Sequence, residues 1–219
     1  KEAAPFRAAM SKALDIALSG RMAPSGLATH LHADGALSMA HAITTHAVQP
    51  QDIDWFTAVD DLTQDAGATG AGHLNTQQFS AGVFYRYASL NLRQLQLNLG
   101  LLPKIDADET AEGRRCALAI AAHVLHLMAT IVPNAKQHSY AAYNPADFVI
   151  VSLAHQPISL ANAFEQPVTC DRKHGGFLRP SIEGLASYWE RINQAYGLDE
   201  QARAFATNPQ IEQSLHPVC

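Results

Sequence analysis

The clearest periodic pattern in the chain lies near its end, where large apolar residues recur every three or four positions. These residues are Ile182, Leu185, Trp189, Ile192 and Tyr196. Apolar residues at this spacing share one face of a helix, and a glycine commonly ends the helix that precedes it. We therefore predict a helix that packs this face into the core and ends at Gly197.

The longest apolar run covers residues 116–132 and predicts a buried core helix. Asp106 and Glu109 have the spacing of a capping box ahead of this run, and Pro133 with Asn134 should stop the helix. The run is too short to span a membrane, so we expect no membrane partner.

His123 and His126 interrupt the same run at a spacing of three residues. The two imidazoles could share a metal ion, but no carboxylate or cysteine lies on the same helical face. We therefore favour structural histidines, and the sequence predicts neither a metal nor a cofactor.

Four segments are rich in β-branched and aromatic residues and end at turn signals, which predicts strands. They are residues 17–22, 37–48, 82–90 and 148–153. The last segment is apolar on both faces, as a central strand would be. Helices follow these strands in an irregular order, which predicts an α+β domain with helices on one face of a mostly antiparallel sheet.

Composition is typical of one cytoplasmic domain. A chain of 219 residues with 47% apolar content can bury one core without disulfide bonds. Cys116, Cys170 and Cys219 are odd in number and form no Cys-x-x-Cys pair, which favours a reducing compartment.

The charge pattern limits how the chain could contact a nucleic acid. Acidic residues outnumber Lys and Arg by 20 to 15, whereas an autonomous nucleic-acid binder is usually basic. No Lys or Arg occurs between Arg21 and Arg86. Contact with RNA in this segment would need backbone N–H groups, hydroxyl groups and apolar wedges that stack on bases.

Several sequence motifs are similar to one known family. The motifs are DIALSGRMAPSG from Asp15, DGALSMAHAITTHAV from Asp34, DIDWFTAVDDL, FSAGVFYRYASLNL, AKQHSYAAYNPADFVIV, ISLANAFE and GGFLRPSIEGLASYWERINQAYGL. Together they cover nearly all of the chain. They resemble the CRISPR-RNA-binding backbone subunit of the type I-E Cascade surveillance complex, the CasC-like family.

This resemblance implies a narrower fold than the strand pattern does. The family has a modified ferredoxin-like palm, similar to an RNA-recognition motif, with a β-hairpin thumb inserted between two strands. The thumb would occupy residues 49–81, with Gly67, Gly70 and Gly72 at its tip. Residues 1–219 would form one incomplete palm domain, because family members carry further segments on both sides. We therefore expect a fragment with an exposed sheet edge.

The resemblance also implies an RNA site. In the family the thumb kinks the guide strand, with a methionine after an SGR tripeptide and a threonine after a WF pair at the kink. The matching residues here are Met22 and Thr57, and Leu74 at the return of the hairpin is carried over with them. Trp55 and Phe56 would form a wedge between bases, although they could instead pin the hairpin onto the palm.

Polar contacts to the RNA backbone would come from a small set of residues. Arg21 is the only basic residue near the wedge, and it could contact a phosphate or pair with an aspartate of the thumb. Ser25 and Thr76 offer hydroxyl groups, and Lys136 with Gln137 lies in a loop that could touch phosphates.

A further basic loop, Lys173-His174-Gly175-Gly176, precedes the last helix. Glycine-containing loops can present backbone N–H groups to anions, so this segment is another candidate contact.

Two enzyme classes are alternatives to this interpretation. His30 and His32 imitate the His-x-His pair of a metal-dependent hydrolase of the amidohydrolase type, which remains the alternative function. That fold needs a barrel of roughly 250 residues, and the chain lacks its βα rhythm. A nuclease could hold magnesium with Asp52, Asp54, Asp60 and Asp61, but these residues lie in a turn-rich hairpin.

The sequence therefore predicts a subunit without catalytic activity that holds guide RNA, polymerises along it and presents bases to target DNA. Its expected partners are the guide RNA, target DNA through the guide, copies of itself and other Cascade subunits.

Overall fold

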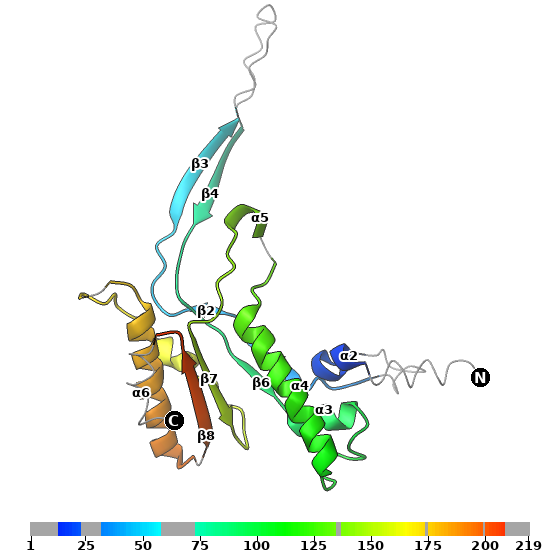
Figure 1. The fold of residues 1–219 in the computed structure, drawn as a ribbon. Coiled ribbons are helices and arrows are strands. Elements are labelled where there is room, and N and C mark those ends of the chain that lie inside the picture. The colour runs from blue at the N-terminus through cyan, green and yellow to red at the C-terminus, as the bar shows by residue number, and fades with distance from the viewer. Residues whose placement is uncertain are drawn as a thin grey trace, which may run out of the picture. The chain divides into compact units, whose positions relative to one another are not determined.

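The computed structural model describes residues 13–22, 32–57, 73–134, 137–173, 175–198 and 200–208 (Figure 1). The chain divides into two compact units. The first comprises residues 1–41, 86–159 and 189–219, and the second comprises residues 42–85 and 160–188.

The first unit combines helices of 4 to 20 residues with two antiparallel strand pairs. Its helices are α2 (Leu14–Ser19), α3 (Leu92–Asn98), α4 (Ala111–Thr130) and α5 (Gln137–Tyr140). Strand β1 (Leu37–Met39) pairs with β6 (Ala88–Leu90), and β7 (Phe148–Leu153) pairs with β8 (Gln201–Ala206). A buried cluster lies where α2, α3 and α4 meet, and it consists of Ala17, Ala36, Leu95 and Ala117.

The second unit contains two further antiparallel pairs. Strand β2 (Ile43–Thr44) pairs with β5 (Phe84–Tyr85), and β3 (Gln51–Thr57) pairs with β4 (His73–Phe79). A 3₁₀ helix, η2 (Ala161–Phe164), and the first part of α6 (Leu178–Tyr196) complete it. All strand pairs among the described residues are antiparallel, so the expectation of an α+β fold with antiparallel pairing is confirmed.

Helix α6 agrees with the periodic pattern that predicted it. Ile182, Leu185 and Trp189 are at most 5% exposed, and Gly197 follows the helix with φ 61°. A positive φ is easily adopted by glycine, which explains why the helix ends there. Tyr196 departs from the prediction because its side chain is 74% exposed.

The predictions for helix α4 need two corrections. Thr110, rather than Asp106 with Glu109, caps the helix, since the Thr110 side chain accepts a hydrogen bond from the Gly113 N–H at 3.0 Å. The helix is also not a buried core element. Gly113 and Ala117 are its buried residues, whereas Leu118 and Leu127 are more than a third exposed. The helix buries its small residues and leaves much of its apolar surface open.

The strand predictions were right in type for three of the four segments. Residues 17–22 are not a strand, because residues 14–19 form α2 and bury Ala17. Residues 37–48 and 82–90 each contain two short strands rather than one long strand. Strand β7 has the predicted bounds, but within the described residues it pairs with β8 alone, so its central position in a sheet is not observed.

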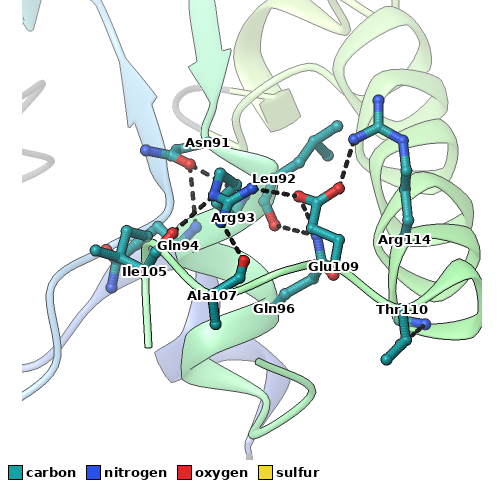
Figure 2. Close-up of polar contacts among 11 residues, drawn as sticks. Asn91, Leu92, Arg93, Gln94, Gln96, Ile105, Ala107, Glu109, Thr110 and Arg114 are labelled. Carbon is teal, nitrogen blue, oxygen red and sulfur yellow. Dashed lines mark hydrogen bonds and ion pairs between the residues drawn. The ribbon is translucent and has the colours of Figure 1, made fainter. Parts of the chain in front are cut away.

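An ion-pair cluster joins α3 to the start of α4 (Figure 2). The Glu109 carboxylate accepts hydrogen bonds from Arg114 at 2.8 Å and from the Gln96 side chain at 3.1 Å, and Arg93 lies 3.6 Å away. Arg93 also donates to the carbonyl groups of Ile105 and Ala107. Glu109 is only 14% exposed, and these donors, Arg114 foremost, lower the pKa of its carboxyl group.

Candidate functional site

The SGR motif lies at a tight crossing of two backbone segments in the first unit. Gly20 has φ 78° and ψ 174°, a conformation that is almost restricted to glycine. The Arg21 N–H donates to the Ala33 carbonyl oxygen at 2.8 Å, and the Arg21 carbonyl oxygen accepts a hydrogen bond from the Ala33 N–H at 3.0 Å. Met22 follows this bridge with its side chain 92% exposed. The crossing therefore presents an apolar side chain to solvent.

Strands β3 and β4 form a ribbon that carries most of the predicted wedge. The register places Phe56 opposite Leu74 and Asp54 opposite Thr76. The Thr76 hydroxyl donates to an Asp54 carboxylate oxygen at 2.8 Å, and both residues are exposed. The ribbon thus brings two predicted contact positions, Phe56 and Leu74, into register although they are 18 positions apart in the sequence.

A buried histidine lies at the base of this ribbon, where the segment before β3 meets the segment after β4. His46 is 6% exposed, and its ring stacks on Phe177 with the ring centroids 3.8 Å apart. The Val83 N–H donates to His46 Nε2 at 3.2 Å, so Nδ1 carries the proton of the neutral ring and donates to the Ala47 carbonyl at 2.9 Å. A Cβ at Gly82 would lie 2.8 Å from Nε2. The ring therefore ties the residues before β3 to those after β4.

Two buried hydroxyl groups, those of Thr45 and Ser181, connect the base of the ribbon to α6. The Oγ of Ser181 lies 2.7 Å from Thr45 Oγ1 and 2.6 Å from the Phe177 carbonyl oxygen. The Val168 N–H donates to the Thr45 carbonyl at 2.9 Å. Three segments of the second unit are thereby joined where the ribbon begins.

The remaining predicted site residues are only partly described. Ser25, Lys136 and His30 lie outside the described residues. The backbone of Trp55, Phe56, Thr57 and Leu74 belongs to the ribbon and that of Gln137 to α5, but their side chains lie outside the description. The proximity of Met22 to Thr57 stays a prediction.

Gly20 and His46 were not predicted from the sequence, although they position the segments around the predicted site. In the sequence, Gly20 is marked only as the middle residue of the SGR tripeptide that precedes Met22. His46 is marked as a polar residue within the apolar strand pattern. Their contacts come from residues distant in sequence, so neither signal identifies a role by itself.

Of the predicted pair His30 and His32, only His32 lies within the described residues. His32 Nε2 lies 3.1 Å from an oxygen of Asp34, and both side chains are more than half exposed. Among the residues that the structure describes, no group of three His, Cys, Asp or Glu side chains could hold a metal ion. None of the described helices combines the length and the apolar character that crossing a membrane requires.

Comparison with known proteins identifies similar chains. A family model described as CT1975-like protein matches residues 1–216. A chain of the solved structure "CRISPR RNA-guided surveillance complex, pre-nicking" is 27% identical with a TM-score of 0.69, and the match covers 96% of this chain and 57% of that one. A chain of a second structure, "CRISPR RNA-guided surveillance complex", is 29% identical with a TM-score of 0.68, over 93% of this chain and 72% of that one.

No curated protein sequence matches the chain significantly. The chain spans little more than half the length of the first of the two solved chains.

Proposed function

The chain belongs to the CT1975-like protein family, and from this premise we propose that it is a subunit of a Cascade-type CRISPR surveillance complex with no catalytic role. The family match over residues 1–216 is the observation that carries the proposal. Two similar solved chains, both from RNA-guided surveillance complexes, support it.

In its finer form, the proposal makes this protein a type I-E, CasC-like backbone subunit. Its palm would be ferredoxin-like and similar to an RNA-recognition motif, and residues 49–81, which contain the β3–β4 ribbon, would be the thumb. Copies of the subunit would polymerise along the guide RNA and kink it, leaving other bases free to pair with target DNA. The chemistry is positioning, so no residue needs a catalytic role.

The described residues support a contact that does not depend on charge. Met22 is exposed beside the Arg21 bridge, and the ribbon holds Phe56 opposite Leu74 without any Lys or Arg in either strand. Bases present flat faces on which apolar and aromatic side chains stack, whatever their sequence.

The direct test is purification of the full-length protein from cells that also produce a guide RNA. We expect a small RNA to co-purify with it at a constant stoichiometry and to resist washing. The same preparation would be analysed for zinc, because a hydrolase built on His30 and His32 would retain stoichiometric metal. Metal without RNA would refute the proposal.

Truncation of Met22 should weaken RNA binding. Met22→Ala removes an exposed apolar side chain, and stacking contacts are worth about 1–3 kcal/mol each, so we expect a loss of roughly 5- to 150-fold in affinity. Titration of full-length protein with a fluorescent guide RNA measures the effect. Met39→Ala is the matched control, since Met39 belongs to the same unit and is also exposed, at 57%. Equal losses for both variants would remove Met22 from the site.

A further inference from the structure

All Lys and Arg residues of the second unit lie in one short segment. This unit comprises residues 42–85 and 160–188, and its basic residues are Arg172, Lys173 and Arg179. The three side chains belong to exposed residues. If this unit contacts a nucleic acid, any ion pair between its Lys or Arg side chains and phosphates must form at this segment.

The loop that carries Arg172 and Lys173 is held as a closed turn. The Lys173 N–H donates to an Asp171 carboxylate oxygen at 2.8 Å. The Gly175 N–H donates to the Asp171 carbonyl, and the Asp171 N–H donates to the Gly176 carbonyl, both at 2.9 Å. Gly175 and Gly176 have φ values of 74° and 77°, and apart from their chain neighbours no described atom lies within 4 Å of a Cβ built on either. The turn is therefore organised and its glycines are uncovered.

A pocket of about 340 Å³ lies beside this turn, and its charged lining residues are Asp171, Lys173, Arg179 and Glu183. Arg179 Nε donates to a Glu183 oxygen at 2.9 Å, and the two side chains are 55% and 57% exposed. An exposed ion pair within one helix is weak, so a phosphate group can compete with the Glu183 carboxylate for the Arg179 guanidinium group.

We propose that this pocket binds a phosphodiester group of the guide RNA through Lys173 and Arg179, with Arg172 adding charge from the turn. The inference rests on the proposed function and assigns it a second kind of contact. Arginine can bind a phosphate through two parallel N–H groups, and lysine binds it as a point charge. The β3–β4 ribbon would then act without charge, and the pocket would supply the ionic contact of the same unit.

The pocket contains both basic and acidic residues, so the proposal predicts effects on RNA affinity in two directions. Replacing Lys173 and Arg179 by alanine should weaken binding and reduce its dependence on salt. Replacing Glu183 by glutamine keeps the size of the side chain but removes the competing charge, so Glu183→Gln should tighten RNA binding at low salt. A role for these residues in folding alone would not produce opposite effects on RNA affinity.

The experiment measures the affinity of full-length protein for a guide RNA over a range of salt concentrations. For Lys173→Ala with Arg179→Ala, we expect the slope of log affinity against log salt to fall by about 0.7 per lost phosphate contact. The matched control is Lys104→Ala with Arg115→Ala, which removes two exposed cations of the first unit. Thermal unfolding of each variant verifies that it is folded.

Each outcome decides the proposal. A reduced slope for the pocket variant together with tighter binding by Glu183→Gln supports it. An unchanged slope, or no gain from Glu183→Gln, overturns it even though the wild-type protein binds RNA. Normal guide binding with weakened capture of complementary DNA would overturn the guide assignment, because the phosphate would then come from the target. A wild-type protein that binds no guide RNA would instead refute the proposed function.

Discussion

Replacement of Gly20 by alanine should lower the free energy of unfolding by about 3 kcal/mol, because both conformation and space oppose a side chain there. The φ of 78° with ψ of 174° strains any residue with a Cβ. That Cβ would also lie 2.6 Å from the Gly35 nitrogen and 2.8 Å from the Ala33 carbonyl oxygen. These are backbone atoms, which cannot move aside without breaking the bridge between Arg21 and Ala33.

Denaturant unfolding of full-length Gly20→Ala measures this loss. Gly184→Ala is the matched control, since Gly184 lies inside α6 and, apart from the backbone of its own helix and its chain neighbours, no described atom lies within 4 Å of an added Cβ. Alanine favours a helix interior by about 1 kcal/mol over glycine, so the control should be neutral or stabilising. Equal stability of the Gly20→Ala variant and the wild-type protein would show that the crossing relaxes easily. RNA binding should also fall in Gly20→Ala, because the crossing positions Arg21 and Met22.

Replacement of Glu109 by glutamine should cost about 2 kcal/mol at neutral pH, since it removes the charge on which two arginines and the Gln96 amide converge. Arg93 and Arg114 are about half exposed, which keeps the loss below that of a fully buried pair. Glu112→Gln is the control, because Glu112 is exposed in the first turn of the same helix. Its effect should stay below about 1 kcal/mol.

The effect of Glu109 should depend on pH with a defined sign. Its pKa is lowered from the ordinary value of 4.5, mainly by the hydrogen bond from Arg114. A lowered pKa stabilises the fold fully above the ordinary value, and this stabilisation is lost as pH falls through the pKa of the folded state. The difference between wild type and Glu109→Gln should therefore be constant near neutral pH and shrink below pH 4.5. A difference that stays constant in acid would contradict the ion-pair account.

The parts of the fold that could be predicted are those specified by local pattern. Helix α6 has an apolar stripe and a terminal glycine, and both signals lie within its own sequence. Strand β7 is a continuous apolar segment with clear ends. For α4 the local signal was ambiguous, because Glu109 suits a capping box but is instead held by Arg114 and Gln96. The hydroxyl of Thr110 makes the cap.

The parts that could not be predicted depend on contacts between distant segments. Residues 17–22 have the composition of a strand, yet Ala17 packs in a core formed with Leu95 and Ala117, which favours the helical turn. The crossing of Gly20 with Gly35 and the contact of His46 with Phe177 likewise join residues far apart in the chain. For the candidate site, the resemblance to a family supplied residues such as Met22 and Thr57, whereas charge and periodicity indicated only which contacts were chemically available.

The closed base beneath the ribbon has a consequence for how this protein can change in length during evolution. His46 and Val83 fix the ends of the β3–β4 segment, so residues can be inserted or deleted beyond this point without disturbing the rest of the second unit. Adding one residue to each strand preserves the pairing, whereas adding one residue to a single strand shifts the register beyond it or creates a β-bulge. Homologues should therefore vary the reach of this ribbon mostly in matched pairs of residues.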